Sequence, residues 1–207
     1  TCAPGQRSWS FVASNIVLDP NTGVGKVYDA KLRINDVPVL YTPYFRFPLD
    51  DRRQTGLLPP HFGTSTNGGF VYAQPIYLNL APNSDATLTP TLYTQRGLLM
   101  KGDFRYLTEN LGRGETSGAV LANDKQTGEG RKSGRFRHDV QWASGWSART
   151  DLNYVSDPFY LTDLGSGLEI ANQTYQERVG DVNYDQGKWH LLARAQGFQT
   201  LDPSLAD

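Results

Sequence analysis

Residues 41–60 read YTPYFRFPLDDRRQTGLLPP, and this stretch decides how the chain is divided. Its aromatic and apolar residues are typical of β-strands, yet it is also rich in proline. The prolines are Pro43, Pro48, Pro59 and Pro60, and Pro75 follows. Proline has no backbone N–H to donate to a neighbouring strand, so within sheets it is confined to edges, strand starts and bulges. We therefore expect one β-unit to end within this stretch and another to begin after it.

The composition indicates strands that show polar groups on one whole face. Of the 207 residues, 38% are hydrophobic, which is low for a globular domain, whereas 12% are aromatic, which is high. Disordered chains are also poor in apolar residues, but they lack aromatic ones as well. The net charge of −1 gives no general attraction to nucleic acid, and we expect no nucleic-acid partner.

Alternation of apolar and polar residues runs through most of the chain after residue 57, and this period of two predicts strands. Residues 135–142 are typical: Phe136, Val140 and Trp142 share one face, and Arg135, Arg137, Asp139 and Gln141 share the other. A soluble β-sandwich and a transmembrane β-barrel both produce this pattern, because each has one apolar and one polar sheet face.

Three features favour the barrel for residues 57–200. The polar faces carry charges of both signs along whole strands, and Trp and Tyr residues lie near strand ends. Short connections also alternate with long ones, as in outer-membrane barrels. The short ones are Ser144–Gly145 and Asp185–Gly187, and the long ones are Asn123–Ser133 and Asp157–Ile170. A soluble carbohydrate-binding or hydrolytic β-sandwich remains the alternative from another class.

No motif for catalysis or metal binding is present in the sequence. The three histidines, His61, His138 and His190, are far apart, and neither paired metal-ligand motifs nor a nucleophile elbow occurs. We therefore expect a conduit or scaffold rather than an enzyme, with no cofactor and no metal.

Several long stretches of the sequence resemble the LptD family of LPS-assembly outer-membrane proteins. The similarity runs through nearly the whole chain. It is strongest at VPVLYTPYFRFPLDDRRQTGLLPP (37–60), at YLNLAPNSDATLTPTLYTQRG (77–97) followed by DFRYL (103–107), and at YVSDPFYLTD (154–163). TCAPG (1–5), followed by SW, matches the segment that holds a cysteine in that family.

The resemblance implies an all-β, antiparallel fold in which the end of a periplasmic β-jellyroll precedes the first strands of a large transmembrane β-barrel. Residues 1–50 match the C-terminal jellyroll strands, residues 51–56 a hinge, and residues 57–207 the first eight or nine barrel strands. Family chains are several times longer, so we expect this chain to be part of a larger protein in the outer membrane of a Gram-negative cell.

The resemblance also implies a function and partners. Family members take lipopolysaccharide from an LptA-type periplasmic bridge and house an LptE-type lipoprotein inside the barrel. Acyl chains leave sideways into the outer-membrane lipid through a lateral gate while the glycan crosses the lumen. Another outer-membrane porin or transporter with a periplasmic domain is the alternative within the same architecture.

Three sets of site residues follow from the resemblance. The gate prolines are Pro60 and Pro75, and the adjacent Pro59 leaves open which of the pair interrupts the strand. Cys2 is either an inert thiol or half of a disulfide, and the matching cysteine of the family pairs with one near the barrel's C-terminus. The candidate lipid path and hinge residues are Val37, Val39, Tyr41, Pro43, Phe45 and Pro48.

The path residues have two interpretations, since filling a jellyroll core and lining an apolar conduit require the same side chains. Pro43 and Pro48 are further expected to end the soluble strand and stiffen the passage that follows.

Overall fold

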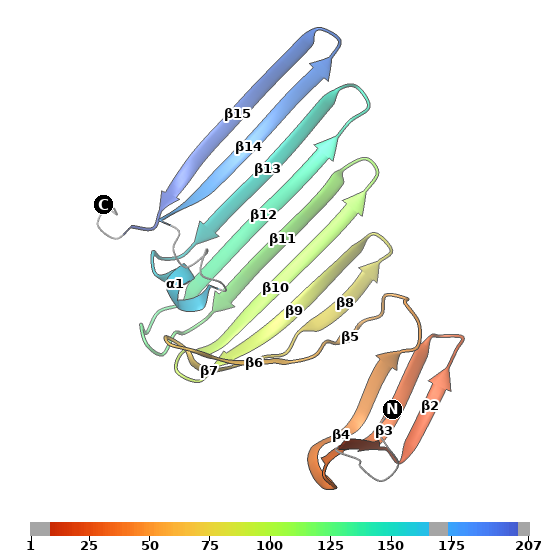
Figure 1. Ribbon diagram of the computed structural model, residues 1–207. Coiled ribbons are helices and arrows are strands. Elements are labelled where there is room, and N and C mark those ends of the chain that lie inside the picture. Colours follow the sequence, from red (N-terminus) through yellow and green to blue (C-terminus); the bar gives the residue numbers. More distant parts are fainter. Residues whose placement is uncertain (1–8, 166–173, 203–207) are drawn as a thin grey trace. The chain divides into compact units, whose positions relative to one another are not determined.

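The computed structural model describes residues 9–165 and 174–202 (Figure 1). The chain divides into two compact units, Thr1–Gly56 and Leu57–Asp207, and each is described by itself. The predicted division into jellyroll strands, hinge and barrel strands stays a prediction.

The first unit is an antiparallel sheet of four strands: β1 (Trp9–Val12), β2 (Asn15–Asp19), β3 (Val24–Ile34) and β4 (Val37–Pro48). β3 lies in the middle, because β1 and β2 pair with it end to end and β4 pairs along its other edge. Val27 and Ala30 on β3 are only 2% and 1% exposed, so the centre of this strand forms the core of the unit.

β4 continues through Pro43, so the expectation that this proline ends the strand is wrong, whereas Pro48 does end it. β4 is an outer strand of the described sheet, where a missing N–H is tolerated. The ladder is also irregular at that point: Tyr28 pairs with Tyr44 and Ala30 with Thr42, while Asp29 between them has a φ of +51°.

The start of the segment after β4 is fastened to the turn between β2 and β3. The Arg52 guanidinium donates to the carbonyl oxygens of Pro20 and Asn21 at 3.2 and 3.1 Å, and Gln54 Nε2 donates to that of Gly23 at 2.7 Å. Arg52 and Gln54, within the predicted hinge, are therefore held against the first unit.

The second unit is a sheet of eleven antiparallel strands (Figure 1). They are β5 (Gly56–Leu57), β6 (His61–Ser65), β7 (Gly69–Ala73), β8 (Ile76–Ala81), β9 (Ser84–Tyr93), β10 (Gly97–Thr108), β11 (Gly112–Leu121), β12 (Arg131–Gln141), β13 (Trp146–Val155), β14 (Tyr175–Gln186) and β15 (Trp189–Thr200). The path from β15 to β6 has nine positions, because β5 lies end to end with β6, and β8 with β7.

The two faces of this sheet differ as the alternation predicts. On one face exposed apolar side chains follow one another from strand to strand; among them are Leu92, Leu98, Met100, Val120, Leu152 and Val182. The predicted fold class is confirmed: both sheets are antiparallel and open, consistent with the end of a jellyroll and part of a barrel.

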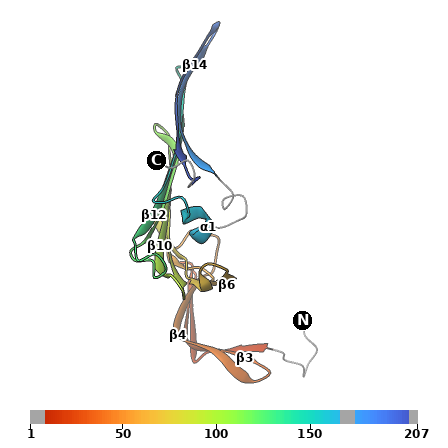
Figure 2. The ribbon, with the colours of Figure 1, turned by 90° about the vertical axis from the view of Figure 1, so that its left-hand side faces the viewer.

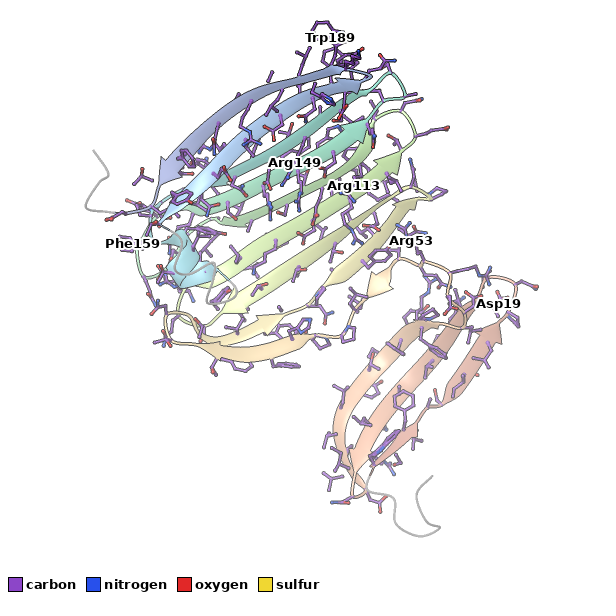
Figure 3. All side chains as sticks on the ribbon, turned by 45° about the horizontal axis from the view of Figure 1, so that its top comes forward. Asp19, Arg53, Arg113, Arg149, Phe159 and Trp189 are labelled. Atoms are coloured by element: carbon purple, nitrogen blue, oxygen red, sulfur yellow. The ribbon has the colours of Figure 1, made fainter. Side chains whose placement is uncertain are left out.

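The other face carries two rows of charges whose sign alternates at every strand. One row is Arg113, Asp139, Arg149, Asp181 and Arg194, and two of its members are labelled in Figure 3. The second row is Asp85, Arg105, Glu115, Arg137 and Asp151. Opposite charges on directly paired residues stabilise a sheet register, whereas like charges would oppose it.

The chain between β13 and β14 contains a helix, α1 (Tyr160–Leu164), which lies against the charged face near one end of the sheet (Figure 2). Its Tyr160, Leu161 and Leu164 are buried in a cluster with Leu99, Leu121 and other residues. A cavity of about 720 Å³ beside it is lined by polar side chains such as Lys101 and Arg135. In the described part of the chain, no helix is long and apolar enough to cross a membrane.

Candidate functional site

Three prolines of the second unit, Pro59, Pro60 and Pro75, interrupt adjacent strands at the same level of the sheet. Pro59 and Pro60 separate β5 from β6, and Pro75 lies between β7 and β8. The ladder resumes on one side with His61 opposite Ala73. On the other side Leu58 N donates to the carbonyl oxygen of Pro75 at 3.0 Å.

This arrangement is a β-bulge, because the two residues Pro59 and Pro60 face the single residue Gln74. The sequence left open which proline of the adjacent pair interrupts the strand. In the structure both lie in the bulge, and neither belongs to a strand.

The Gln74 side chain bridges the interruption. Because Pro75 has no N–H, it cannot return a hydrogen bond to the carbonyl oxygen of Leu58. Gln74 Nε2 donates to that oxygen instead, at 2.8 Å, and also reaches the carbonyl oxygen of Pro75 at 3.2 Å. The hydroxyl of Tyr72 donates to Gln74 Oε1 at 3.1 Å and fixes the orientation of the amide.

A further proline, Pro90, lies at the same level on the next strand, β9. It removes one more backbone donor there, although β9 itself is continuous. Gln74 N donates to the Pro90 carbonyl oxygen at 3.1 Å, but Pro90 has no N–H to donate in return. Two residues lie between Ala73 and Ile76, and two lie between their β9 partners Thr91 and Leu88, so the register with β9 is unchanged across the gap. We call Pro59, Pro60, Pro75 and Pro90 together the proline line.

The proline line weakens the sheet locally without unravelling it. A net hydrogen bond contributes about 0.5–1.5 kcal/mol to stability. The contacts on both sides of the line are regular, with five residue pairs joining β6 to β7 and ten joining β9 to β10. Fewer backbone hydrogen bonds therefore join these strands at this level than on either side of it.

The candidate lipid-path residues lie on β4 in the first unit. Val37, Val39 and Tyr41 are 61%, 53% and 54% exposed, and Phe45 is 42% exposed. Leu40 on the same strand is equally exposed, so both faces of β4 are open in this chain and neither interpretation of these residues is favoured. Cys2 lies outside the described residues.

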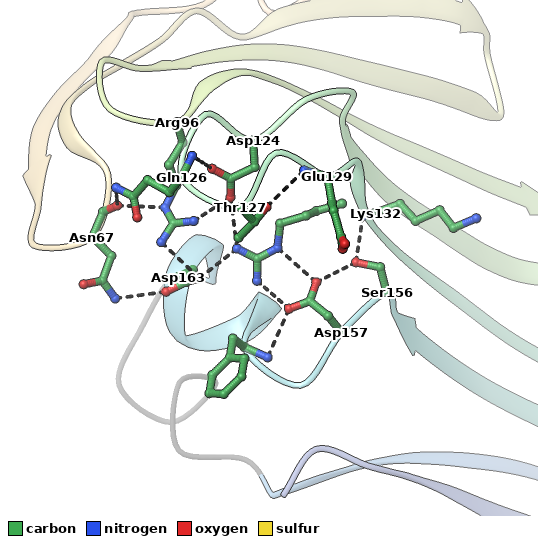
Figure 4. Close-up of polar contacts among 12 residues, drawn as sticks. Asn67, Arg96, Asp124, Gln126, Thr127, Glu129, Lys132, Ser156, Asp157 and Asp163 are labelled. Carbon is green, nitrogen blue, oxygen red and sulfur yellow. Dashed lines mark hydrogen bonds and ion pairs between the residues drawn. The ribbon is translucent and has the colours of Figure 1, made fainter. Parts of the chain in front are cut away.

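At the end of the sheet where α1 lies, a buried ion cluster joins three connections between strands, β9–β10, β11–β12 and β13–β14 (Figure 4). Its members are Arg96, Asp124, Arg131, Asp157 and Asp163. Asp124 is fully buried, and the side chains of Arg96 and Arg131 are 3% exposed.

The ion pairs of the cluster are short. The two guanidinium groups meet at Asp124 Oδ2, with Arg96 Nη1 at 2.5 Å and Arg131 Nη1 at 3.2 Å. They also share Asp163 Oδ2, at 3.0 and 2.7 Å respectively, and Arg131 Nη2 lies 2.6 Å from Asp157 Oδ1.

Burial alone would raise the pKa values of Asp124 and Asp157, but donors around both carboxylates reverse the effect. The N–H of Gln126 and the two arginines lower the pKa of Asp124, and Arg131 with Ser156 lowers that of Asp157. Both carboxylates are therefore ionised at neutral pH, as an ion cluster requires.

The effect of the prolines on a strand could be predicted from the sequence, because proline lacks a backbone N–H donor in any fold. Pro90 was missed, although it falls in a stretch that resembles the family, because no interruption of β9 marks it. The ion cluster was missed because its members come from three separate connections. The one available signal was that the long connection Asn123–Ser133 contains acids together with Arg131, while the long connection Asp157–Ile170 contains further acids.

The fold and the proline line define a class of protein. An open antiparallel sheet with one apolar and one charged face has the character of a wall between lipid and water, and here prolines remove backbone donors at one level of it. Comparison with known proteins specifies the family. The family model described as "LptD protein" matches residues 27–156, and that described as "LPS transport system D" matches residues 130–207.

Relatives cover the whole chain. It is 43% identical to the LPS-assembly protein LptD of Acinetobacter baumannii, over 100% of this chain and 26% of that protein. It is 41% identical to the same-named protein of Alcanivorax borkumensis, over 100% of this chain and 27% of that protein. With the corresponding protein of Pseudomonas putida strain GB-1 the identity is 47%, over 89% of this chain and 20% of that protein. The chain belongs to the LptD family, and it spans about a quarter of the length of the first two relatives.

Proposed function

We propose that this chain is part of an outer-membrane translocon that receives lipopolysaccharide from the periplasm and inserts it into the outer leaflet through a lateral gate. The names of its relatives support the substrate and the process. The observation that carries the gate is the proline line, which crosses three adjacent strand positions at one level. The role requires no catalytic group.

The first unit supplies the periplasmic end of this route. β4 offers a row of apolar side chains to acyl chains delivered by an LptA-type bridge protein, and the chain then passes directly to the strands that carry the proline line. An LptE-type lipoprotein would occupy the lumen, against the charged face. A disulfide from Cys2 to a cysteine beyond this chain would hold the exit of the first unit against the entrance of the barrel.

The connectivity gives the sheet an orientation in the membrane. β5 pairs with β8, whose turn to β9 is at the end of the sheet opposite α1, so the chain enters at the short-turn end. A periplasmic first unit therefore places that end in the periplasm. The three connections joined by the ion cluster would then lie on the extracellular side, as the long loops of outer-membrane barrels do.

The test is to restore backbone donors along the proline line in the full-length protein. Pro60→Ala and Pro75→Ala each add an N–H, and each new net bond of about 0.5–1.5 kcal/mol would make opening about 2- to 13-fold rarer. We expect a folded, inserted protein that exports newly made lipopolysaccharide more slowly, with the double variant slower than either single one. Pro82→Ala, in the β8–β9 turn away from the line, is the control and should export normally.

Unchanged lipopolysaccharide export and outer-membrane permeability in the double variant would contradict the gate. Pro60 and Pro75 would then be ordinary bulge and edge residues.

A further inference from the structure

The β6–β7 hairpin, which begins and ends next to the proline line, is bound at its tip by three hydrogen bonds at one residue, Asn67. Asn67 Nδ2 donates to Asp163 Oδ1 at 3.1 Å. Its carbonyl oxygen accepts from Arg96 Nε at 2.7 Å and from Gln126 Nε2 at 2.9 Å. Two of these partners are members of the ion cluster, so the tip of the hairpin is attached directly to that cluster (Figure 4).

The attachment is firm because the cluster itself is held from several elements. Arg96 follows β9, Asp124 follows β11, Arg131 begins β12 and Asp163 is in α1. If one charged side chain moved out of the cluster, its partner would remain buried without a counter-charge, which is strongly unfavourable. The tip is therefore joined to a rigid part of the sheet.

Hydrogen bonds to the β9–β10 turn secure the hairpin further. Thr94 N donates to the Phe70 carbonyl oxygen at 3.1 Å, and Phe70 N donates to Thr94 Oγ1 at 3.0 Å. Gln95 N donates to the Gly68 carbonyl oxygen at 3.1 Å. The tip thus has its donors and acceptors satisfied, in contrast to the proline line a few residues away.

We propose that the ion cluster anchors the tip of the β6–β7 hairpin, so that the gate opens at the proline line and toward the periplasmic end while its extracellular tip stays closed. Asn67, Arg96 and Asp163 are then positioning residues for export. The inference rests on the proposed function, since an anchor beside a weak line matters only if that line opens. It adds that acyl chains enter the membrane on the periplasmic side of the hairpin tip. It also adds that the anchor prevents the strands from separating along their whole length.

Two variants of the full-length protein release the tip in different ways. Arg96→Gln with Asp163→Asn removes one positive and one negative charge, so the charge of the cluster is unchanged. Asn67→Ala with Gln126→Ala keeps every charged member and removes two of the three hydrogen bonds at the tip. The matched control is Arg135→Gln with Asp151→Asn, which removes an ion pair of 2.8 Å on the charged face away from the hairpin.

A photocrosslinking amino acid at one of two positions reports where the gate opens. Leu57 on β5 is 66% exposed and adjoins the proline line, whereas Thr64 on β6 is exposed near the hairpin tip. Cells assemble each protein with its lipoprotein, heat-modifiable migration checks that the barrel is folded, and crosslinks to lipopolysaccharide are then quantified.

We expect Leu57 to capture lipopolysaccharide in the unmodified and control proteins while Thr64 captures little. In both anchor variants we expect capture at Thr64 to rise at least severalfold, and the cells to become sensitive to a large antibiotic that the intact membrane excludes. A variant that is merely less stable would lower capture at both positions.

The anchor proposal is overturned if the crosslinker at Thr64 captures as much lipopolysaccharide as the one at Leu57 in the unmodified protein. It is also overturned if, in folded anchor variants, the crosslinker at Leu57 captures lipopolysaccharide and the one at Thr64 does not. Silence at both positions in every protein would instead overturn the proposed gate, and the anchor with it.

Discussion

The side chain of Gln74 supplies a hydrogen bond where the prolines remove backbone donors. Its amide gives the Leu58 carbonyl the hydrogen bond that Pro75 cannot donate, so the two strands are joined there by one backbone bond, from Leu58 N to the Pro75 carbonyl oxygen, and one side-chain bond. A side chain can rotate away and return, whereas a ladder bond breaks only when the strands part. The proline line is therefore closed by a contact that is easily reversed.

We predict that Gln74→Met, which keeps the length but removes the donor, makes the gate easier to open. Losing a net bond of about 0.5–1.5 kcal/mol corresponds to opening about 2- to 13-fold more often. The expected result is higher entry of large antibiotics with normal barrel assembly, which is opposite in sign to the effect of Pro75→Ala. Gln74→Glu should be at least as leaky, because its carboxylate faces two carbonyl oxygens.

Permeability equal to that of the unmodified protein in both Gln74 variants would show that the bridge has no part in closing the line. Gln176→Met on β14, a glutamine distant from the prolines, is the matched control.

At the scale of elements, strands could be predicted from the sequence and the short helix could not. The alternation over residues 135–142 placed charges on one face of β12 because side chains alternate along any strand. α1 has five residues, too few for a helical period to be visible, and it is held by Leu99 and Leu121 from distant strands. Its position depends on contacts that only the folded sheet brings together.

The ion cluster that fastens α1 should loosen only in acid. The folded pKa values of Asp124 and Asp157 are lowered, so their stabilisation is complete above the ordinary aspartate pKa of about 3.9 and is lost as the pH falls through the folded values. A spin label at the exposed Phe159 should stay immobilised from pH 7 to about 5 and gain mobility below about 4. A label at Glu109, in a turn at the other end, should not change; loosening at Phe159 already between pH 7 and 6 would contradict the account.

At the scale of the whole molecule, this chain is one part of a wall. The sheet ends at β6 on one side and at β15 on the other, and both are outer strands in the described residues. Backbone groups facing lipid require partners, so in a membrane these edges would need further strands to close on them. The resemblance predicts that more barrel strands follow, and this stays a prediction, whereas composition and periodicity predicted only the character of each strand.

The central claim is that lipopolysaccharide passes from β4 to the proline line, and photocrosslinking in active cells tests it most directly. The crosslinker is placed at Val37, Val39, Tyr41 or Phe45 on β4, at Leu57 beside the line, or at the control position Trp189 on β15. The account predicts capture of lipopolysaccharide at one or more β4 positions and at Leu57, with loss of both when its synthesis is stopped, and none at Trp189. Capture of protein alone at every β4 position and at Leu57 would contradict it and leave these residues as core and edge side chains.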